Sequence, residues 1–360
     1  MALKTIFQAI YSPLGFTKAY AFTLWFIVSG ALVGFILARL QFLDIDGRLC
    51  PAVPANDGSS GFPAACYWIV HFRRYRVAMI LHLATSLPAG LIAVFQFLPA
   101  IRHKCILYHR IAGYIAITLG FIGNIGACML ADTAMGGEFS MQTLIGFVAF
   151  VTTLTLAMAV YNIKKLQLDG HRAWMIRSWV YMGFVVTLRI IQPTMANIVT
   201  KWPSAAKYVA VSCKELHYIY FAGQKLGQGT YTQDSLDKFK ADYPPCAEHP
   251  LAEKIYVAVQ GVLSPDDPGK VNVALMSTFA ASGVFAFLLH AVCAEIYIWL
   301  TPAENARLRE VSYQRQLRRG FPNPGSEGLV AQRFGDAREW VPDASSESPE
   351  TQSNEGKAQS

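Results

Sequence analysis

The sequence predicts an all-α membrane protein, a polytopic bundle of about six transmembrane helices with a lumenal or extracellular loop subdomain. Of its 360 residues, 53% are hydrophobic and only 15% are charged, whereas about a quarter of the residues of an average soluble domain are charged. The apolar residues gather in runs of about 20, the length that a helix needs to cross a hydrocarbon core of about 30 Å. Six such runs occur, over residues 20–40, 75–99, 107–130, 143–161, 173–198 and 271–300.

Lysine and arginine in the loops predict the orientation of these helices, because they are enriched on the cytosolic side of membrane proteins. The turn "ADTAMGGEFSM", residues 131–141, contains neither. The turns after the second and fourth runs and the tail after the sixth are basic, with Arg102, Lys104, Lys164, Lys165, Arg172, Arg307, Arg309, Arg315, Arg318 and Arg319. This pattern predicts both termini in the cytosol, in a multi-pass protein of an endomembrane or the plasma membrane. The arginines at 73, 74 and 76 oppose it.

The chain divides into five predicted segments: a cytosolic lead (1–19), a five-helix membrane core (20–198), an outer loop subdomain (199–270), a sixth transmembrane helix (271–300) and a cytosolic tail (301–360). The tail begins basic and becomes polar from about Pro322, where it is predicted to be disordered. The first apolar run is too long for a cleaved signal peptide and is predicted to be a signal anchor. We call residues 41–74 the first outer loop and residues 199–270 the second outer loop.

Cysteine positions agree with this topology. Cys50 and Cys66 fall in the first outer loop, and Cys213 and Cys246 fall in the second. An even number of cysteines on one face suits disulfides in an oxidising lumen or exterior. Four cysteines allow three pairings, so the connectivity stays open. The other three cysteines lie in or beside the apolar runs and are predicted to be packing residues.

Small and polar residues form stripes on three helices, which is typical of the faces through which membrane helices pack. Each stripe contains a histidine: His82 in the second helix, His109 in the third and His290 in the sixth. A charged side chain inside a bilayer is costly and should face a partner or water, so ionisable residues within the spans mark a candidate functional site.

Depth along the helices, at about 1.5 Å per residue, groups these residues into two layers. We predict an outer layer of His82, Arg189 and Gln192, with His82 and Arg189 as the candidate catalytic residues. We predict an inner layer that would bind a cofactor, consisting of His109, Arg110, His171, Arg177 and His290. Arg177 is close enough to the inner mouth to extend to the interface.

Arg189 lies about 13 Å below the outer end of its helix and needs an acceptor there. The neighbouring helices offer no Asp or Glu at that depth. Its partner is therefore predicted to be an anionic ligand, namely a propionate, a carboxylated lipid or a phosphate, because arginine binds such groups through a bidentate fork.

Three motifs stand out between residues 75 and 195. They are a helix with His82 and a terminal Gln96-Phe97, an H-R-x-x-G helix start (His109, Arg110, Gly113), and an H-R-x-W-M-x-R helix start that ends in L-R (His171, Arg172, Trp174, Met175, Arg177, Arg189). Together they resemble a family of integral membrane proteins from bacteria and fungi, a domain of unknown function. The resemblance implies a membrane helix bundle and does not imply an activity.

Three classes of function stay open. The first is a b-type haem oxidoreductase, because imidazoles on facing helices at equal depth are haem ligands. His109 and His171 fit this pattern, with Arg110 and Arg177 available for the propionates. A single metal ion bound by His109, His171 and His290 is an adjacent hypothesis, since neutral imidazole suits Zn, Cu and Fe.

The second class is a cofactor-free enzyme, a cyclase or isomerase acting on a lipophilic isoprenoid or polyketide in specialised metabolism. A histidine beside an arginine in a dry cavity could transfer protons, and the arginine could hold an anionic head or polarise a carbonyl. His82 and Arg189 would take these parts. The spans offer no obvious Asp or Glu as a strong acid, which disfavours the protonation of epoxides or alkenes.

The third class is a lipid-binding, ligand-binding or transport protein. Pro88 and Pro193 could break their helices, as in transporters, but no inverted repeat is visible. The sequence has no nucleophile elbow or phosphate loop, which argues against the corresponding hydrolases and nucleotide-driven pumps. The net charge of +7 is largely juxtamembrane. It predicts contact with membrane lipid, beside a lipophilic or anionic small molecule, and no binding of nucleic acid.

Overall fold

The computed structural model describes residues 8–51, 62–202, 207–221 and 233–342. The chain divides into two compact units, and each is described by itself. Unit 1 comprises residues 1–149 and 183–287, and unit 2 comprises residues 150–182 and 288–360.

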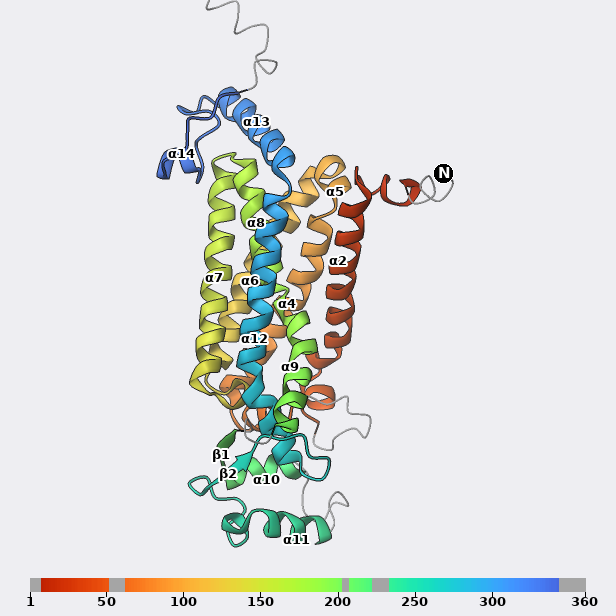
Figure 1. Cartoon of the computed structure of the whole chain (residues 1–360), viewed down its shortest axis with the longest axis vertical. Helices are drawn as coiled ribbons and strands as arrows, with labels where there is room; N and C mark the ends of the chain where they lie inside the picture. The colour runs from red at the N-terminus through yellow and green to blue at the C-terminus, as the bar shows by residue number, and fades with distance from the viewer. Residues whose placement is uncertain (1–7, 52–61, 203–206, 222–232, 343–360) are drawn as a thin grey trace, which may run out of the picture. The chain divides into compact units, whose positions relative to one another are not determined.

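The predicted fold class is confirmed: the described residues contain six helical stretches that are long and apolar enough to cross a membrane. They can be followed in Figure 1 as α2 (Ala19–Leu40), α4 (Arg73–Gln96), α6 (Ile106–Leu130), α7 (Phe139–Lys164), α8 (Leu168–Met182) continued by α9 (Phe184–Lys201), and α12 (Pro268–Trp299). The short connecting helices are η1 (Gln41–Leu43), α5 (Pro99–Lys104), η3 (Ala134–Gly136) and η5 (Pro244–Cys246).

The fifth span is interrupted at Gly183, between α8 and α9. The two prolines considered as helix breakers, Pro88 and Pro193, lie instead inside α4 and α9. Proline is tolerated within membrane helices because neighbouring groups satisfy the backbone that it frees. The expected breaks at these prolines are therefore wrong.

The small residues of α6 set its distance from α4. A Cβ atom on Gly126 would lie 2.7 Å from the backbone nitrogen of His82, and one on Gly123 would lie 3.1 Å from the Thr85 hydroxyl oxygen. At Gly126 a Cβ would meet the backbone of α4, so the two helices approach backbone to backbone there, whereas at Gly123 it would meet side-chain hydroxyls. This is the close packing that the stripes predicted.

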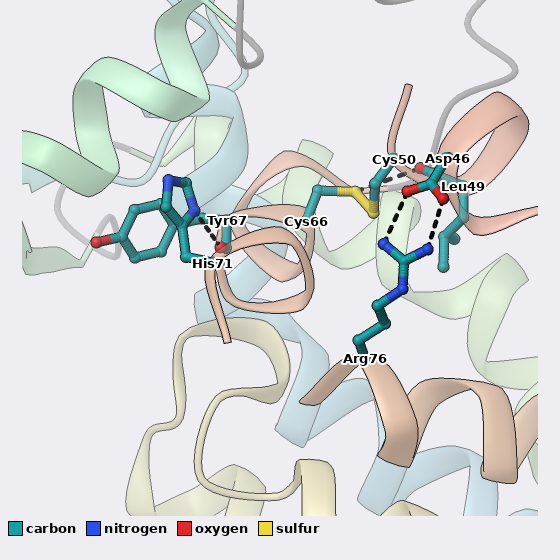
Figure 2. Close-up of a disulfide and its surroundings, with 7 residues drawn as sticks. All are labelled: Asp46, Leu49, Cys50, Cys66, Tyr67, His71 and Arg76. Carbon is teal, nitrogen blue, oxygen red and sulfur yellow. Dashed lines mark hydrogen bonds and ion pairs between the residues drawn. A yellow bond between two sulfur atoms is a disulfide. The ribbon is translucent and has the colours of Figure 1, made fainter. Parts of the chain in front are cut away.

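In the first outer loop, η2 (Ile45–Leu49) is linked to α3 (Pro63–His71) by a disulfide between Cys50 and Cys66. Figure 2 shows this bond with the ion pair of Arg76 and Asp46 beside it, in which the guanidinium donates to both carboxylate oxygens, at 2.8 and 2.5 Å. The hydrogen bonds from Arg76 hold the pKa of the Asp46 carboxyl below its ordinary value.

The second outer loop is ordered over the residues that the structure describes. Strands β1 (Tyr208–Ser212) and β2 (Tyr256–Gln260) pair antiparallel, with Ala210 opposite Ala258. Two helices, α10 (Cys213–Phe221) and α11 (Gln233–Asp242), complete it. Its core includes Phe239, Leu216 and Val259, and a second disulfide joins Cys213 to Cys246. The predicted disulfides are thus confirmed. The pairing that the sequence left undecided is Cys50 with Cys66 and Cys213 with Cys246.

In unit 2, α13 (Pro302–Arg318) follows α12, and α14 (Ala331–Phe334) follows a loop. The loop is fastened to the α7–α8 turn by fully buried amides. Gln316 donates to the carbonyl oxygen of Lys165 at 2.8 Å, and its Oε1 accepts from Gly325 N at 2.6 Å. Gln167 Oε1 accepts from Gly328 N at 3.3 Å.

The expectation of a disordered tail from Pro322 onward is therefore wrong up to residue 342. The segment is polar, but Val330 is buried, and the backbone of the segment bonds to side chains of α13 and of the α7–α8 turn. Residues 343–360 of the predicted disordered tail lie outside the described residues, as do residues 1–7 of the predicted lead.

Candidate functional site

His82 lies on the face of α4 that packs against α6, and the backbone fixes its ring. Its Nδ1 lies 3.0 Å from the carbonyl oxygen of Gly123. Because a carbonyl oxygen can only accept, Nδ1 is the nitrogen that donates, and Nε2 of the neutral ring carries the lone pair. The Ser86 hydroxyl oxygen lies 3.4 Å from the same Nδ1. His82 is therefore held in one tautomer within the α4–α6 pair.

Arg189 and Gln192 on α9 both face α12. Gln192 is buried, and its Nε2 donates to the carbonyl oxygen of Leu275 at 3.0 Å. One turn earlier on α9, the guanidinium carbon of Arg189 lies 5.4 Å from the ring centroid of Phe279. The structure thus places both of these predicted outer-layer residues of α9 against α12. His82, by contrast, bonds to α6, and no contact among the described residues joins it to Arg189.

Arg39 is a neighbour of Arg189 that the sequence analysis missed. It lies in the last turn of α2, and its guanidinium is the charged group that acts electrostatically on Arg189. Within the described residues, neither guanidinium forms an ion pair with a carboxylate. The available signal was an isolated arginine near the end of an apolar run, which is easily taken for an interfacial anchor.

In unit 2, Arg177 of α8 is paired with Glu295 of α12. The guanidinium donates from Nε to Oε1 at 2.6 Å and from Nη2 to Oε2 at 2.7 Å, and the Tyr181 hydroxyl donates to Oε1 at 3.3 Å. The guanidinium also lies over the ring of Trp174. Two expectations are corrected: the spans do contain an acidic residue, and Arg177 has a protein partner.

The two histidines of unit 2 lie at different levels. His290 Nδ1 donates to the carbonyl oxygen of Val180 at 2.7 Å, and His171 Nδ1 donates to that of Ala159 at 2.9 Å. His171 and Val180 are two and a half turns apart on α8, about 13 Å at roughly 1.5 Å per residue. The placement of His171 and His290 in one inner layer is therefore wrong.

The predicted metal site is not assembled by these side chains. Over the described ranges, no group of three or more His, Cys, Asp or Glu side chains is placed to bind a metal ion. His171 and His290 face different backbone carbonyls at different levels, which is the physical reason. His109, on α6 of unit 1, is partly buried, and the neighbouring Arg110 is exposed. The pairing of His109 with His171 around a haem, with Arg110 and Arg177 for its propionates, stays a prediction.

A further ionisable group that the sequence did not indicate lies in α10. Burial raises the pKa of the Glu215 carboxyl to about 7, and a hydrogen bond from the Trp68 ring opposes this shift. Glu215 belongs to the contact between α10 and α3, where Tyr67 and Tyr218 stack edge to face with ring centroids 5.7 Å apart. The sequence gives little indication that Glu215 is buried, because a glutamate in the first turn of a helix is favourable there whether or not it is buried.

Comparison with known proteins bears on the resemblance to a membrane-protein family. Residues 79–215 match a protein family described as a predicted membrane protein, DUF2306. The resemblance to an integral membrane family is thereby confirmed. The matched DUF2306 region begins in α4, ends in α10 and contains His82, His109, His171 and Arg189.

A protein of Aspergillus versicolor, named Ava biosynthesis cluster protein G, is 24% identical over 343 residues. The alignment covers 83% of this chain and 94% of that relative. The similarity therefore extends beyond the DUF2306 region. No solved structure matches the chain significantly.

Proposed function

We propose that this chain is a membrane-embedded enzyme of a biosynthetic pathway that transfers protons on a lipophilic substrate of isoprenoid or polyketide type. The observation that carries this proposal is the geometry of His82, an imidazole fixed inside a helix pair in a single tautomer. The name of the Aspergillus relative, a biosynthesis cluster protein, supports a role in biosynthesis. A cyclisation or isomerisation is the reaction class that this site fits best.

His82 would act as a general base and then as a general acid. The bond from Nδ1–H to the Gly123 carbonyl leaves the lone pair on Nε2. That nitrogen would take a proton from a C–H or O–H group of the substrate and return it at another atom, so the reaction needs no net proton. An imidazole is suited to this because its ordinary pKa lies near neutral pH.

Arg189 would hold the anionic end of the substrate. Its guanidinium lies over Phe279 and has no carboxylate partner within the described residues. A guanidinium stacked on a ring keeps its in-plane N–H groups for a bidentate acceptor. We therefore expect Arg189→Leu to abolish function. Lys164→Ala, which removes a basic residue at the C-terminal end of α7, should preserve it.

The proposal is tested by complementation of a host in which the gene has been deleted, with lipophilic metabolites profiled by mass spectrometry. His82→Gln should accumulate the same precursor as the deletion. His103→Gln, which changes an exposed histidine of α5, is the matched control and should restore the product. Full restoration by His82→Gln, at an expression level equal to that of the wild type, would overturn the proposal.

A second candidate is a haem oxidoreductase with His109 and His171 as ligands. The observation that favours it is the bond from His171 Nδ1 to the Ala159 carbonyl, since ligating histidines commonly donate their other ring nitrogen to such a group. An absorption spectrum of the purified protein before and after dithionite decides it. A Soret band that disappears in His109→Ala and His171→Ala would support this candidate, and a featureless spectrum from folded protein would contradict it.

A further inference from the structure

Two arginines on the contacting helices α2 and α9 have no carboxylate counter-ion among the described residues. Arg39 lies in the last turn of α2, and Arg189 lies on α9, the helix that α2 contacts. The two guanidinium groups interact electrostatically. Two like charges on contacting helices repel each other, so a shared anion would stabilise both.

The described acidic residues of the first outer loop, and Asp132 of the α6–α7 turn, already have other partners. Asp46 is bonded to Arg76, and Asp132 forms an ion pair with Arg74 at 3.2 Å. Asp44 caps a turn through the backbone nitrogen of Gly47 at 2.9 Å. The described residues therefore supply no carboxylate to Arg39 and Arg189.

Aromatic rings hold both guanidinium groups in place. The guanidinium carbon of Arg39 lies 5.3 Å from the ring centroid of Phe35 and 5.2 Å from that of Phe42. Arg189 lies over Phe279 on α12. Contact with a ring face occupies the π surface of a guanidinium and leaves its N–H edges available. Both arginines therefore keep N–H groups available for an anionic ligand.

The α9 side of this arginine pair is exposed. Arg189 is exposed on the surface of the helices, and the next residue, Ile190, is 68% exposed. A ligand could therefore enter from the bilayer, with an apolar chain along α9 and a polar head at the end of α2.

We infer that Arg39 and Arg189 together bind a phosphomonoester or diphosphate group carried by an apolar chain. Two guanidinium charges are balanced by a dianion, whereas a carboxylate or a phosphodiester, with a single charge, leaves one of them uncompensated. Phosphate oxygens also match the fork of arginine. The inference deepens the proposed function and rests on it for the identity of the substrate, which would be a prenyl phosphate or diphosphate. The same headgroup chemistry occurs in phosphatidic acid.

Thermal unfolding of the full-length protein in phosphatidylcholine nanodiscs tests this assignment. The probes are farnesyl diphosphate and phosphatidic acid, with farnesol as the uncharged comparison. At least one phosphorylated probe should raise the Tm of the wild type, and farnesol should not. Arg39→Gln and Arg189→Gln should each lose the shift, because the remaining guanidinium is a single charge. Arg48→Gln changes another exposed arginine of the first outer loop and should keep it.

The outcomes separate the two sources of phosphate and the two proposals. A shift with farnesyl diphosphate alone supports a substrate site, and a shift with phosphatidic acid alone supports a structural lipid. His82→Gln should keep the shift even where it abolishes metabolite production, so a failure of the catalytic proposal is distinguishable. If either arginine variant folds poorly, Arg→Lys at the same position should keep a reduced shift. The inference is overturned if neither phosphorylated probe raises the Tm of the wild type. It is also overturned if the Tm shift in both Gln variants equals that of the wild type.

Discussion

Arg177 on α8 and Glu295 on α12 meet through two parallel hydrogen bonds, Nε to Oε1 at 2.6 Å and Nη2 to Oε2 at 2.7 Å. Both residues belong to helices that are apolar enough to cross a membrane. A two-point pair of this kind fixes the rotation of each helix as well as their distance. The pair therefore helps to fix how α8 packs against α12 in unit 2.

We predict that Glu295→Gln destabilises the protein by about 2 kcal/mol, between the effects of exposed and buried pairs, because it leaves Arg177 without its counter-charge. Unfolding of the purified protein in mixed detergent micelles measures this. The double variant Arg177→Met/Glu295→Leu should recover most of the loss. Glu304→Gln, which removes a pair at the exposed surface of α13, is the control and should cost little. An equal loss of stability in Glu295→Gln and Glu304→Gln would contradict this role for the pair.

The predicted orientation can be tested with a single substitution. Gln233→Asn creates an Asn-Asp-Ser acceptor at an exposed position of α11, in the second outer loop. We expect this variant to be glycosylated in a eukaryotic host, because the loop carries the Cys213–Cys246 disulfide and disulfides form on the lumenal side. Gly356→Thr creates an acceptor in the C-terminal tail and should stay unmodified. Modification of the tail variant instead would place both termini outside the cytosol.

Glu215 should make the stability of the outer region depend on pH. Burial raises its pKa from 4.5 to about 7, so between these pH values the folded chain holds a proton that the unfolded chain has lost. The free energy of unfolding therefore falls as the pH rises from about 4.5 to about 7, by at most about 3 kcal/mol.

The comparison of wild type with Glu215→Gln isolates this contribution from those of other groups. Glu215→Gln should be more stable than the wild type above pH 7 and should lose that advantage near pH 5, as measured by denaturant unfolding at both pH values. Glu253→Gln is the control, since Lys214 lowers the pKa of Glu253 and its effect has the opposite sign. A pH-independent difference between wild type and Glu215→Gln would contradict the assignment.

Gln316 should hold the segment after α13 in place. It is fully buried and bonds to Lys165 O, to Gln167 Oε1 and to Gly325 N. Gln316→Leu removes the acceptor of Gly325 N and the donor to Lys165 O, which costs about 2 kcal/mol, and should free residues 320–334. Hydrogen exchange should then accelerate there and proteolysis should begin there. Gln314→Ala, two residues away on α13, should change neither; protection unaltered in Gln316→Leu would refute the role.

The sequence by itself determined the membrane class, the number of spans and the cysteines that pair. These follow from local properties: the length of an apolar run needed to cross a bilayer, and the compartment in which cysteines are oxidised. Neither depends on how one helix is rotated against another. The resemblance to an integral membrane family was also visible in the sequence.

Only the tertiary structure decided which residues meet. Glu295 becomes the partner of Arg177, and Arg39 becomes the neighbour of Arg189, through the rotation and depth of helices far apart in the chain. Depth estimated from helix ends placed His171 and His290 in one layer, whereas bonds to different carbonyls separate them. The order of residues 322–342 comes from buried amides of other segments. What a polar or charged side chain does depends on the group that it contacts, and the packing of the helices decides which group that is.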